Sequence, residues 1–456
     1  MDPLTYLKGN YKKIYSETSS GAAKLPKGYE ASHPLQITGF HSPHTTDYGN
    51  EPPGALVCTA LPAVTKQPTV SNYPDGWTQC LISPAAKRAI VNTPGFPQRI
   101  QRPPEIRHRI APTSDRGVGV FAKVDLKAGD LIFSERPMLI ATPTVPMPHP
   151  SQVPSYFTQQ QVMQVGLQQA EKQLEMVFSR FLEEQKEAYM ALYNSHKHDG
   201  SGPILGVMRT NSFGVLVGGE IYGSVCKDAS RFNHRYLQVT SYSTAHPSPP
   251  PSPPSCCPNT GRTFNQLTFA MEIRAIRNIL KGDELTNAYV DIELPHRARH
   301  QDLNPYGFQC RCASCKNPAE SDARRAFYRT QIPISESSGL TLRMVVWLMA
   351  PESELSEDYV VEHSKQQLAM MEDDGLETAN AYVRHLDHLV DVYCAAENLA
   401  EGVVYLSKLD VLQRAVMGGE KKSVAELMKK AKAHRRWGWK SRVLGVMKFL
   451  GGAGEV

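Results

Sequence analysis

Apolar residues follow two different periods along the chain, and the change between them divides the sequence. Ile106–Ile110 alternates apolar with other positions, Gly117–Ala122 is an apolar run with a Gly-rich start, and Leu131–Glu135 is a further short strand-like segment that ends before Pro137. Alternation with a period of two predicts strands. From Thr158 to Ser195 apolar residues instead recur every three or four positions between Gln, Glu and Lys. This spacing predicts an amphipathic helical insertion over residues 156–200.

Strand character returns after the insertion and is followed by a long helical region. Asn211–Val217 and Leu267–Ile273 alternate again, and Lys281–Leu285 has the composition of a turn. Beyond residue 318 the period is helical, and Leu376–Cys394 and Leu399–Met417 read as an antiparallel pair of helices. We therefore expect an α+β domain over residues 105–318, followed by an all-α domain of TPR-like helix pairs over residues 319–456.

Residues 1–104 show no sustained period of either kind. They are rich in Pro, Thr, Ser and Gly, a composition typical of segments without a packed core. We expect a loosely ordered N-terminal arm that contains a few short packed pieces, such as Gly76–Ile82.

Composition narrows the class of protein. With 456 residues, 41% hydrophobic and 21% charged, the chain is typical of a soluble globular protein with room for two or three domains. The net charge of +5 predicts local rather than whole-surface contacts with acidic partners. No apolar run approaches the roughly 20 residues that span a bilayer, and no secretory leader is visible. We expect a monomer inside the cell, in the nucleus or the cytoplasm, without membrane contact or a direct nucleic-acid motif.

One basic segment qualifies that expectation. Lys421–Arg442 is strongly basic and carries Trp437 and Trp439. A solvated helix face is one interpretation, and a contact with an acidic or nucleic-acid partner is the other.

The cysteines predict a metal site. Nine cysteines are too few for a disulfide scaffold of this length, and Cys310, Cys312 and Cys315 fall within six residues. Structural zinc takes four ligands in a tetrahedron, so a fourth must come from elsewhere, with Cys256 and Cys257 as distant candidates. The alternative is a group of reduced cysteines that only pack together.

Three other features are weak when taken singly. Gly117-x-Gly119 suits any tight turn, Tyr289 suits a core or interface position, and Asn233-His234 suits a hydrogen-bonded loop. Their order along the chain is more informative than any one of them.

In that order, Gly117-Val-Gly-Val-Phe-Ala, Asn211-Ser-Phe, Asn233-His with Ser-Cys-Cys-Pro-Asn259, Lys281-Gly-Asp-Glu-Leu and Tyr306-Gly-Phe-Gln-Cys resemble the SET domain. The likeness is to the SET and MYND class of protein-lysine methyltransferases and their fungal relatives, without a MYND finger, because the insertion contains no cysteine. The resemblance covers about residues 105–318. It implies a SET-domain β-fold of small curved sheets with a knot-like crossing.

The resemblance also implies an activity and its residues. The activity is methyl transfer from S-adenosylmethionine to a lysine of a protein substrate, histone or non-histone, beside a catalytic tyrosine that corresponds to Tyr289. Positions that match cofactor contacts are Gly117, Gly119, Asn211, Asn233, His234 and Phe308. Positions that match ligands of a structural Zn²⁺, held by a post-SET segment over residues 306–317, are Cys256, Cys310, Cys312 and Cys315.

A 20-residue segment, Arg235–Pro254, interrupts this pattern. It ends in a proline-rich run that cannot join a sheet ladder, and its removal would restore Asn-His-Ser-Cys-Cys-Pro-Asn. We interpret it as a retained intron that impairs activity. The alternative origin of the segment is a genuine surface loop, which would serve as a polyproline ligand. The alternative function of the protein is that of a non-catalytic SET-fold binding or scaffold protein.

Overall fold

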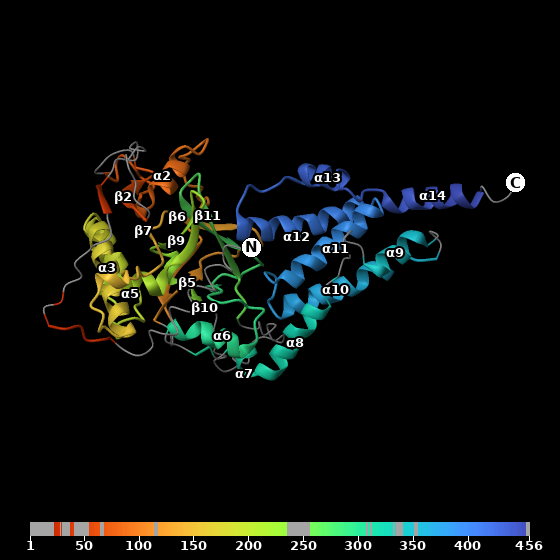
Figure 1. Ribbon diagram of the computed structural model, residues 1–456. Coiled ribbons are helices and arrows are strands. Elements are labelled where there is room, and N and C mark those ends of the chain that lie inside the picture. Colours follow the sequence, from red (N-terminus) through yellow and green to blue (C-terminus); the bar gives the residue numbers. More distant parts are fainter. Residues whose placement is uncertain are drawn as a thin grey trace, which may run out of the picture.

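The sheets lie in one half of the molecule together with the helices that pack on them, and the other half is helical (Figure 1). The structure is a computed structural model that describes residues 22–27, 29, 37–40, 54–63, 68–113, 117–234, 256–306, 309–310, 312–331, 333, 341–350 and 354–452. The predicted α+β class, with small sheets and many helices, is confirmed.

The largest sheet joins the N-terminal region to the centre of the chain. Its six described strands lie in the order β1 (Ile37–Phe40), β2 (Leu56–Leu61), β3 (Thr78–Ile82), β7 (Leu139–Ala141), β9 (Glu220–Val225) and β8 (Phe213–Val217). β3 runs parallel to β7. Helix α2 (Pro84–Val91) follows β3 in the chain, with Ser83 as its N-cap.

This sheet corrects the expectation of a loosely ordered N-terminal arm. Residues 56–91 contribute two strands and a helix, and every residue of β3 is buried. Strands that are covered on both faces carry no alternation of apolar and polar residues, so the period that marks a half-exposed strand is absent. That absence made the segment look unstructured.

Two smaller sheets carry the motifs singled out in the sequence. One lies in the order β10 (Asn233–His234), β13 (Glu284–Asn287), β5 (Val118–Ala122) and β4 (His108–Pro112). The other lies in the order β11 (Thr260–Asn265), β12 (Ala270–Ala275) and β6 (Leu131–Glu135). β10 pairs in parallel with β13, so two segments about fifty residues apart lie side by side.

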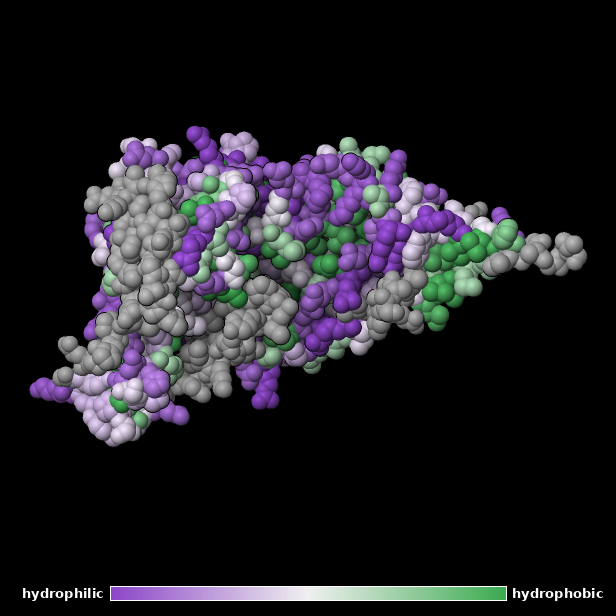
Figure 2. Space-filling model, turned by 45° about the horizontal axis from the view of Figure 1, so that its top comes forward, coloured by the Kyte–Doolittle hydropathy of each residue, from purple (hydrophilic) through white to green (hydrophobic). Residues whose placement is uncertain are grey.

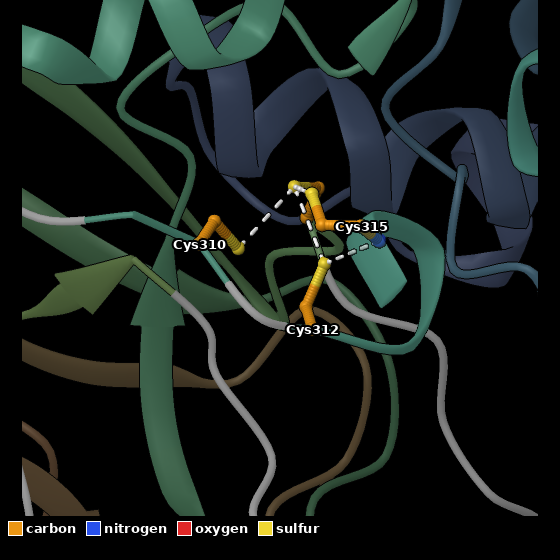
Figure 3. Close-up of side chains that lie close together, drawn as sticks. Cys310, Cys312 and Cys315 are labelled. Atoms are coloured by element: carbon orange, nitrogen blue, oxygen red, sulfur yellow. Dashed lines mark hydrogen bonds between the residues drawn. The ribbon is translucent and has the colours of Figure 1, made fainter. Parts of the chain in front are cut away.

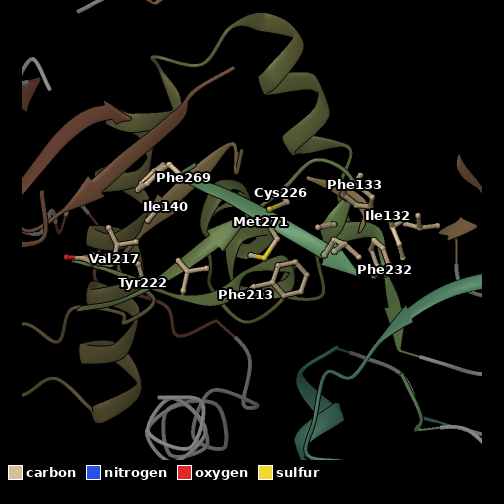
Figure 4. Packing of buried hydrophobic residues seen from close by; sticks show 14 of the residues in the cluster. Ile132, Phe133, Ile140, Phe213, Val217, Tyr222, Cys226, Phe232, Phe269 and Met271 are labelled. Atoms are coloured by element: carbon tan, nitrogen blue, oxygen red, sulfur yellow. The ribbon is translucent and has the colours of Figure 1, made fainter. Parts of the chain in front are cut away.

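One apolar core connects the three sheets. Phe133, Phe213, Phe232 and Met271 belong to a single buried cluster, although they come from different sheets and from the turn before β10 (Figure 4). Since close-packed interiors deform little, this core fixes the strands relative to one another.

The helical insertion covers one side of the large sheet. It contains α3 (Gln159–Phe178), α4 (Glu183–Met190) and α5 (Pro203–Asn211), preceded by a short helix η1 (Pro150–Gln152). Thr158 and Gln161 form a capping box at the start of α3. Leu167, Leu174 and Val177 pack into one buried cluster with residues of the sheet, as the helical period predicts.

Helices form the remainder of the chain. They comprise η2 (Ala229–Arg231), α6 (His296–Leu303), η3 (Asn304–Tyr306), α7 (Ala313–Lys316), α8 (Pro318–Thr330), α9 (Leu342–Met349), α10 (Asp358–Asp373), α11 (Asn380–Ala395), α12 (Leu399–Met417), α13 (Val424–Lys432) and α14 (Trp439–Gly452). The predicted helix pair corresponds to α11 and α12. None of the described helices combines the length and the apolar character that crossing a membrane requires.

The outer end of the helical half is apolar. Figure 2 shows a hydrophobic area there, where α9 and α14 expose Leu342, Val346, Met349, Val446 and Phe449.

Polar contacts fasten the helical half to the sheets. The thiol of Cys257 donates to the carbonyl oxygen of Asp374 at 2.6 Å, and Arg277 lies 2.5 Å from Glu377. Arg414 of α12 donates to the carbonyl of Gly129 at 3.1 Å. Cys257 therefore joins the two halves, while its neighbour Cys256 faces the cysteine cluster described below.

Candidate active site and metal centre

Gly117 and Gly119, at the start of β5, are each required to be glycine for a different structural reason. Gly117 has a φ of +71°, a conformation that a residue with a side chain adopts only under strain, and open space surrounds its α-carbon. Gly119 has an ordinary φ, but an added Cβ would lie 2.9 Å from the amide nitrogen of Asn233 and 2.7 Å from a carboxylate oxygen of Glu284. Gly119 thus permits a close approach by the strip that carries Asn233.

Asn233 connects three segments of the site. Its side-chain amide donates to the carbonyl oxygen of Val118 at 3.2 Å and to the carboxylate of Glu284 at 2.9 Å. The structure therefore brings Asn233 against the glycine turn. His234 follows it in β10, where its backbone pairs with Asn287; the side chain of His234 lies outside the described residues.

Asn211 has a different local environment. Its side-chain amide donates to the carbonyl oxygens of Tyr193 and Val207, at 2.6 and 2.7 Å, within the helical insertion. Its own carbonyl accepts from the hydroxyl of Ser230 at 3.0 Å, in the turn that leads to Asn233. It ends α5 rather than beginning the strand expected from residue 211, because its side chain satisfies helix carbonyls. A direct cofactor contact by Asn211 stays a prediction.

Tyr289 lies just beyond β13 and is held in place. Its hydroxyl donates to the carbonyl oxygen of Phe232 at 2.5 Å. Phe232 is the residue before Asn233. Its ring centroid lies 4.8 Å from that of Tyr306. The two rings form an aromatic pair beside the Asn233 strip; the predicted contact residue Phe308 lies outside the described residues.

One charged neighbour of this pair has no motif in the sequence. Arg262, on β11, places its guanidinium carbon 4.5 Å from the ring centroid of Phe213 and donates to the carbonyl of Ala288 at 3.4 Å. Burial lowers the pKa of Arg262, and Tyr306 and Tyr289 oppose that effect. A single arginine in a strand carries no spacing signal, and only the fold shows that it belongs to the site.

The four predicted zinc ligands come together. The sulfur of Cys256 lies 3.8, 3.6 and 3.5 Å from those of Cys310, Cys312 and Cys315, all buried (Figure 3). Zinc–sulfur bonds of about 2.3 Å in a tetrahedron require sulfur–sulfur distances of about 3.8 Å. The donor set and its spacing therefore fit a structural zinc ion. Cys256 adopts a φ of +57°, which is unusual for a residue with a side chain.

A buried cation lies beside the cysteines. Arg299 of α6 is fully buried, and its Nη2 lies 3.9 Å from the sulfur of Cys315. Burial alone would lower the pKa of Arg299, but the sulfurs of Cys256 and Cys315 outweigh it and raise that pKa. Four thiolates around Zn²⁺ carry a net charge of −2, so a cation at this position is favourable. His296 and His300 of the same helix also lie near Cys315.

A carboxylate supports the turn before β10. Glu135 accepts from the backbone N–H groups of Asp228 and Ala229, the latter at 2.6 Å. Burial, together with the neighbouring carboxylate of Asp228, raises the pKa of Glu135 to about 7. His108 contacts Asp228 at 3.0 Å from the other side. This network positions the segment that delivers Phe232 and Asn233.

Comparison with known proteins agrees with this arrangement. Residues 117–290 match the SET domain family model. "Histone-lysine N-methyltransferase set5" of Schizosaccharomyces pombe is 25% identical over 209 residues, which are 46% of this chain and 50% of that protein. "Histone-lysine N-methyltransferase ATXR2" of Arabidopsis thaliana is 39% identical over 70 residues, 15% of each chain. "N-lysine methyltransferase SMYD2-A" of Xenopus laevis is 38% identical over 76 residues, 16% of this chain and 17% of that one.

This chain thus spans half the length of the S. pombe relative and less of the other two. A solved structure described as the SET domain of LSMT bound to lysine and AdoHcy aligns with 80% of this chain and 92% of its own. The identity is 13% and the TM-score is 0.24. The glycine turn, Asn233, Cys256 and Tyr289 all fall within the range of the family match. Residues 117–290 of this chain are a SET domain.

Proposed function

We propose that this chain transfers a methyl group from S-adenosylmethionine to a lysine side chain of a protein substrate. The observation that carries the proposal is the convergence of Gly117, Gly119 and Asn233 at one place, with Tyr289 fixed beside it. The SET-domain match and the relatives named as histone-lysine and N-lysine methyltransferases support it. The acceptor would be a lysine of a histone or of another protein.

The glycine turn would receive the cofactor. Gly117 keeps the space beside its α-carbon open, and Asn233 is oriented by its bonds to Val118 and Glu284. Backbone groups can approach a ligand closely where no side chain intervenes. We propose Asn211, His234 and Phe308 as further cofactor contacts.

Tyr289 would orient the attacking amine. Lysine has an ordinary pKa of about 10.4, and only its neutral amine can displace the methyl group from a sulfonium. Because the hydroxyl hydrogen of Tyr289 is committed to the carbonyl of Phe232, its oxygen acts as an acceptor toward the amine. The ring of Tyr306 lies against that of Tyr289 and restricts the approach. Alignment, rather than acid–base chemistry, is the contribution of these residues.

Zinc would have a structural role. Cys256, Cys310, Cys312 and Cys315 would hold the ion and so tie the segment after α6 to the strip after β10. The ion would fix the chain around Tyr306, and no step of methyl transfer involves it.

We further propose that Arg235–Pro254 is a retained intron that lowers activity. Residues 235–255 lie outside the described residues. Before them Asn233 and His234 form β10, and after them Cys256 joins the cysteine cluster. Sequencing of the transcript tests the origin of the segment. An abundant messenger that contains only the long form would contradict it.

Calorimetry tests the proposed function. S-adenosylmethionine is titrated into the full chain and into a chain that lacks residues 235–254. We expect both to bind and the shortened chain to bind more tightly. Binding without methylation of any member of a lysine peptide array would favour a non-catalytic SET-fold binding protein. Failure of both chains to bind S-adenosylmethionine would refute the proposal.

A further inference from the structure

We propose that Arg262 makes this site selective for the neutral form of the substrate amine, by holding a fixed positive charge beside the Tyr289–Tyr306 pair. The inference rests on the proposed lysine methyl transfer. The least favourable requirement of that reaction is the removal of a proton from lysine, and we assign Arg262 a role in it. Arg262 would act on the substrate through its charge, without receiving that proton.

The position of Arg262 follows from three elements that meet around its guanidinium. β11 supplies the residue itself, and β8 supplies the ring of Phe213, 4.5 Å from the guanidinium carbon. The segment after β13 supplies the carbonyl of Ala288, which accepts from Arg262 at 3.4 Å. Ala288 directly precedes Tyr289, so the cation is held next to the residue proposed to orient the amine. Arg262 is also only partly exposed.

Three buried arginines of this protein are each paired with a carboxylate, unlike Arg262. Arg274, Arg414 and Arg436 lie 2.9, 2.8 and 2.8 Å from the carboxylates of Glu272, Asp410 and Asp391. In the part of the chain that the structure describes, no carboxylate forms such a pair with Arg262, whose contacts are a ring and a carbonyl oxygen. Among the described residues, its charge is therefore not compensated by a carboxylate at the site.

An uncompensated cation acts on the protonation of a second cation. The guanidinium stays protonated because arginine keeps its proton in proteins, although burial lowers the pKa of Arg262 from its usual value. A lysine ammonium about 6–10 Å away would be repelled, which lowers the lysine pKa by about 1–2 units at an effective dielectric constant of about 20. Near pH 8 the neutral fraction of the amine would rise about 10- to 100-fold. The stacked ring of Phe213 keeps the guanidinium at the wall of the site.

The opposite interpretation is that Arg262 occupies the place of the substrate amine and blocks it. The two interpretations differ in sign. Removing a blocking side chain raises the rate at every pH, whereas removing a charge that favours the neutral amine lowers the rate at neutral pH and leaves it nearly unchanged at high pH.

The test measures single-turnover methyl transfer between pH 7 and 10, with S-adenosylmethionine and core histones as acceptors. The chain without residues 235–254 is used in parallel with the full chain. Arg262→Gln keeps a donor for the carbonyl of Ala288 but removes the charge, Arg262→Lys keeps the charge, and Arg262→Met removes both. Arg343→Met is the matched control, because Arg343 also lies over a ring, that of Tyr359 at 5.8 Å, in the helical half.

We expect Arg262→Gln and Arg262→Met to move the midpoint of the pH–rate profile upward by about 1–2 units, with a rate near pH 8 about 10- to 100-fold lower. Arg262→Lys and Arg343→Met should keep the midpoint. Circular dichroism and calorimetric binding of S-adenosylmethionine show whether each variant folds. If Arg262→Met does not fold, the midpoint measured for Arg262→Gln tests the inference.

An unchanged midpoint in Arg262→Gln, or a faster rate at all pH values, would overturn the inference while leaving the proposed function intact. A wild-type chain that transfers no methyl group in either form would instead refute the proposed function, and this inference with it.

Discussion

Replacing Gly119 with alanine should weaken cofactor binding more than it weakens the fold. The added Cβ would lie 2.7 Å from an oxygen of Glu284, 2.9 Å from the amide nitrogen of Asn233 and 2.9 Å from the methyl group of Thr113. These contacts are too short, so the Asn233–Glu284 hydrogen bond of 2.9 Å must break or shift. All three atoms are ends of side chains that can move, so the cost in stability should be about 1–3 kcal/mol, a typical cost of overpacking.

The displacement of Asn233 should be visible in affinity. Calorimetry should show S-adenosylmethionine binding at least about 10-fold weaker in Gly119→Ala, equivalent to about 1.4 kcal/mol. Gly282→Ala is the control, since Gly282 has a φ of +93° and open space around it, in the turn before β13. That variant should lose about 1 kcal/mol of stability through backbone strain and keep its affinity. Wild-type affinity in Gly119→Ala would show that the position of Asn233 does not govern cofactor binding.

Four further changes test other parts of the site. Tyr289→Phe removes the hydrogen bond to Phe232, and should cost about 0.5–1.5 kcal/mol in a denaturant titration and lower the methylation rate about 100-fold without loss of S-adenosylmethionine binding. Cys312→Ser should release zinc, measured by atomic emission, and lower the melting temperature; an unchanged metal content would contradict the four-cysteine site. Arg299→Met leaves the charge of the zinc–thiolate group uncompensated, and should weaken zinc affinity about 10- to 100-fold in a chelator competition. Glu135, whose pKa is raised to about 7 from 4.5, binds more protons in the folded state than in the unfolded state between those values. The free energy of unfolding should therefore fall as pH rises from 5 to 7, by on the order of 2 kcal/mol, and Glu135→Gln should flatten that dependence.

The sequence predicted those parts of the site that depend on chemically distinctive residues, namely cysteines and glycines. Three cysteines within six residues suggested a metal site, and the motif order suggested Cys256 as the fourth ligand; the structure places all four sulfurs together. The glycine turn and Asn233 both match cofactor contacts of the resemblance, and the structure brings them together although more than 100 residues separate them. Such residues are recognisable because few other residue types can ligate a tetrahedral ion or allow two backbone segments to approach closely.

The remainder depends on tertiary contacts that leave no local pattern. β2 and β3 are buried on both faces, so their residues lack the alternation that marks a strand at the surface. Arg262 is one arginine within an ordinary strand sequence, and only the pairing of β11 with its neighbours brings it to Phe213 and Ala288. The side chain of Asn211 bonds to helix carbonyls that its motif does not mention.

The proposed methyl transfer is tested most directly by following an isotope-labelled methyl group from S-adenosylmethionine to a protein. The full chain and the chain without residues 235–254 are incubated with core histones, and the products are mapped by mass spectrometry. We expect label on lysine side chains, with much less from Tyr289→Phe at an equal occupancy of S-adenosylmethionine. Label on another residue type, or equal labelling by Tyr289→Phe, would contradict this expectation.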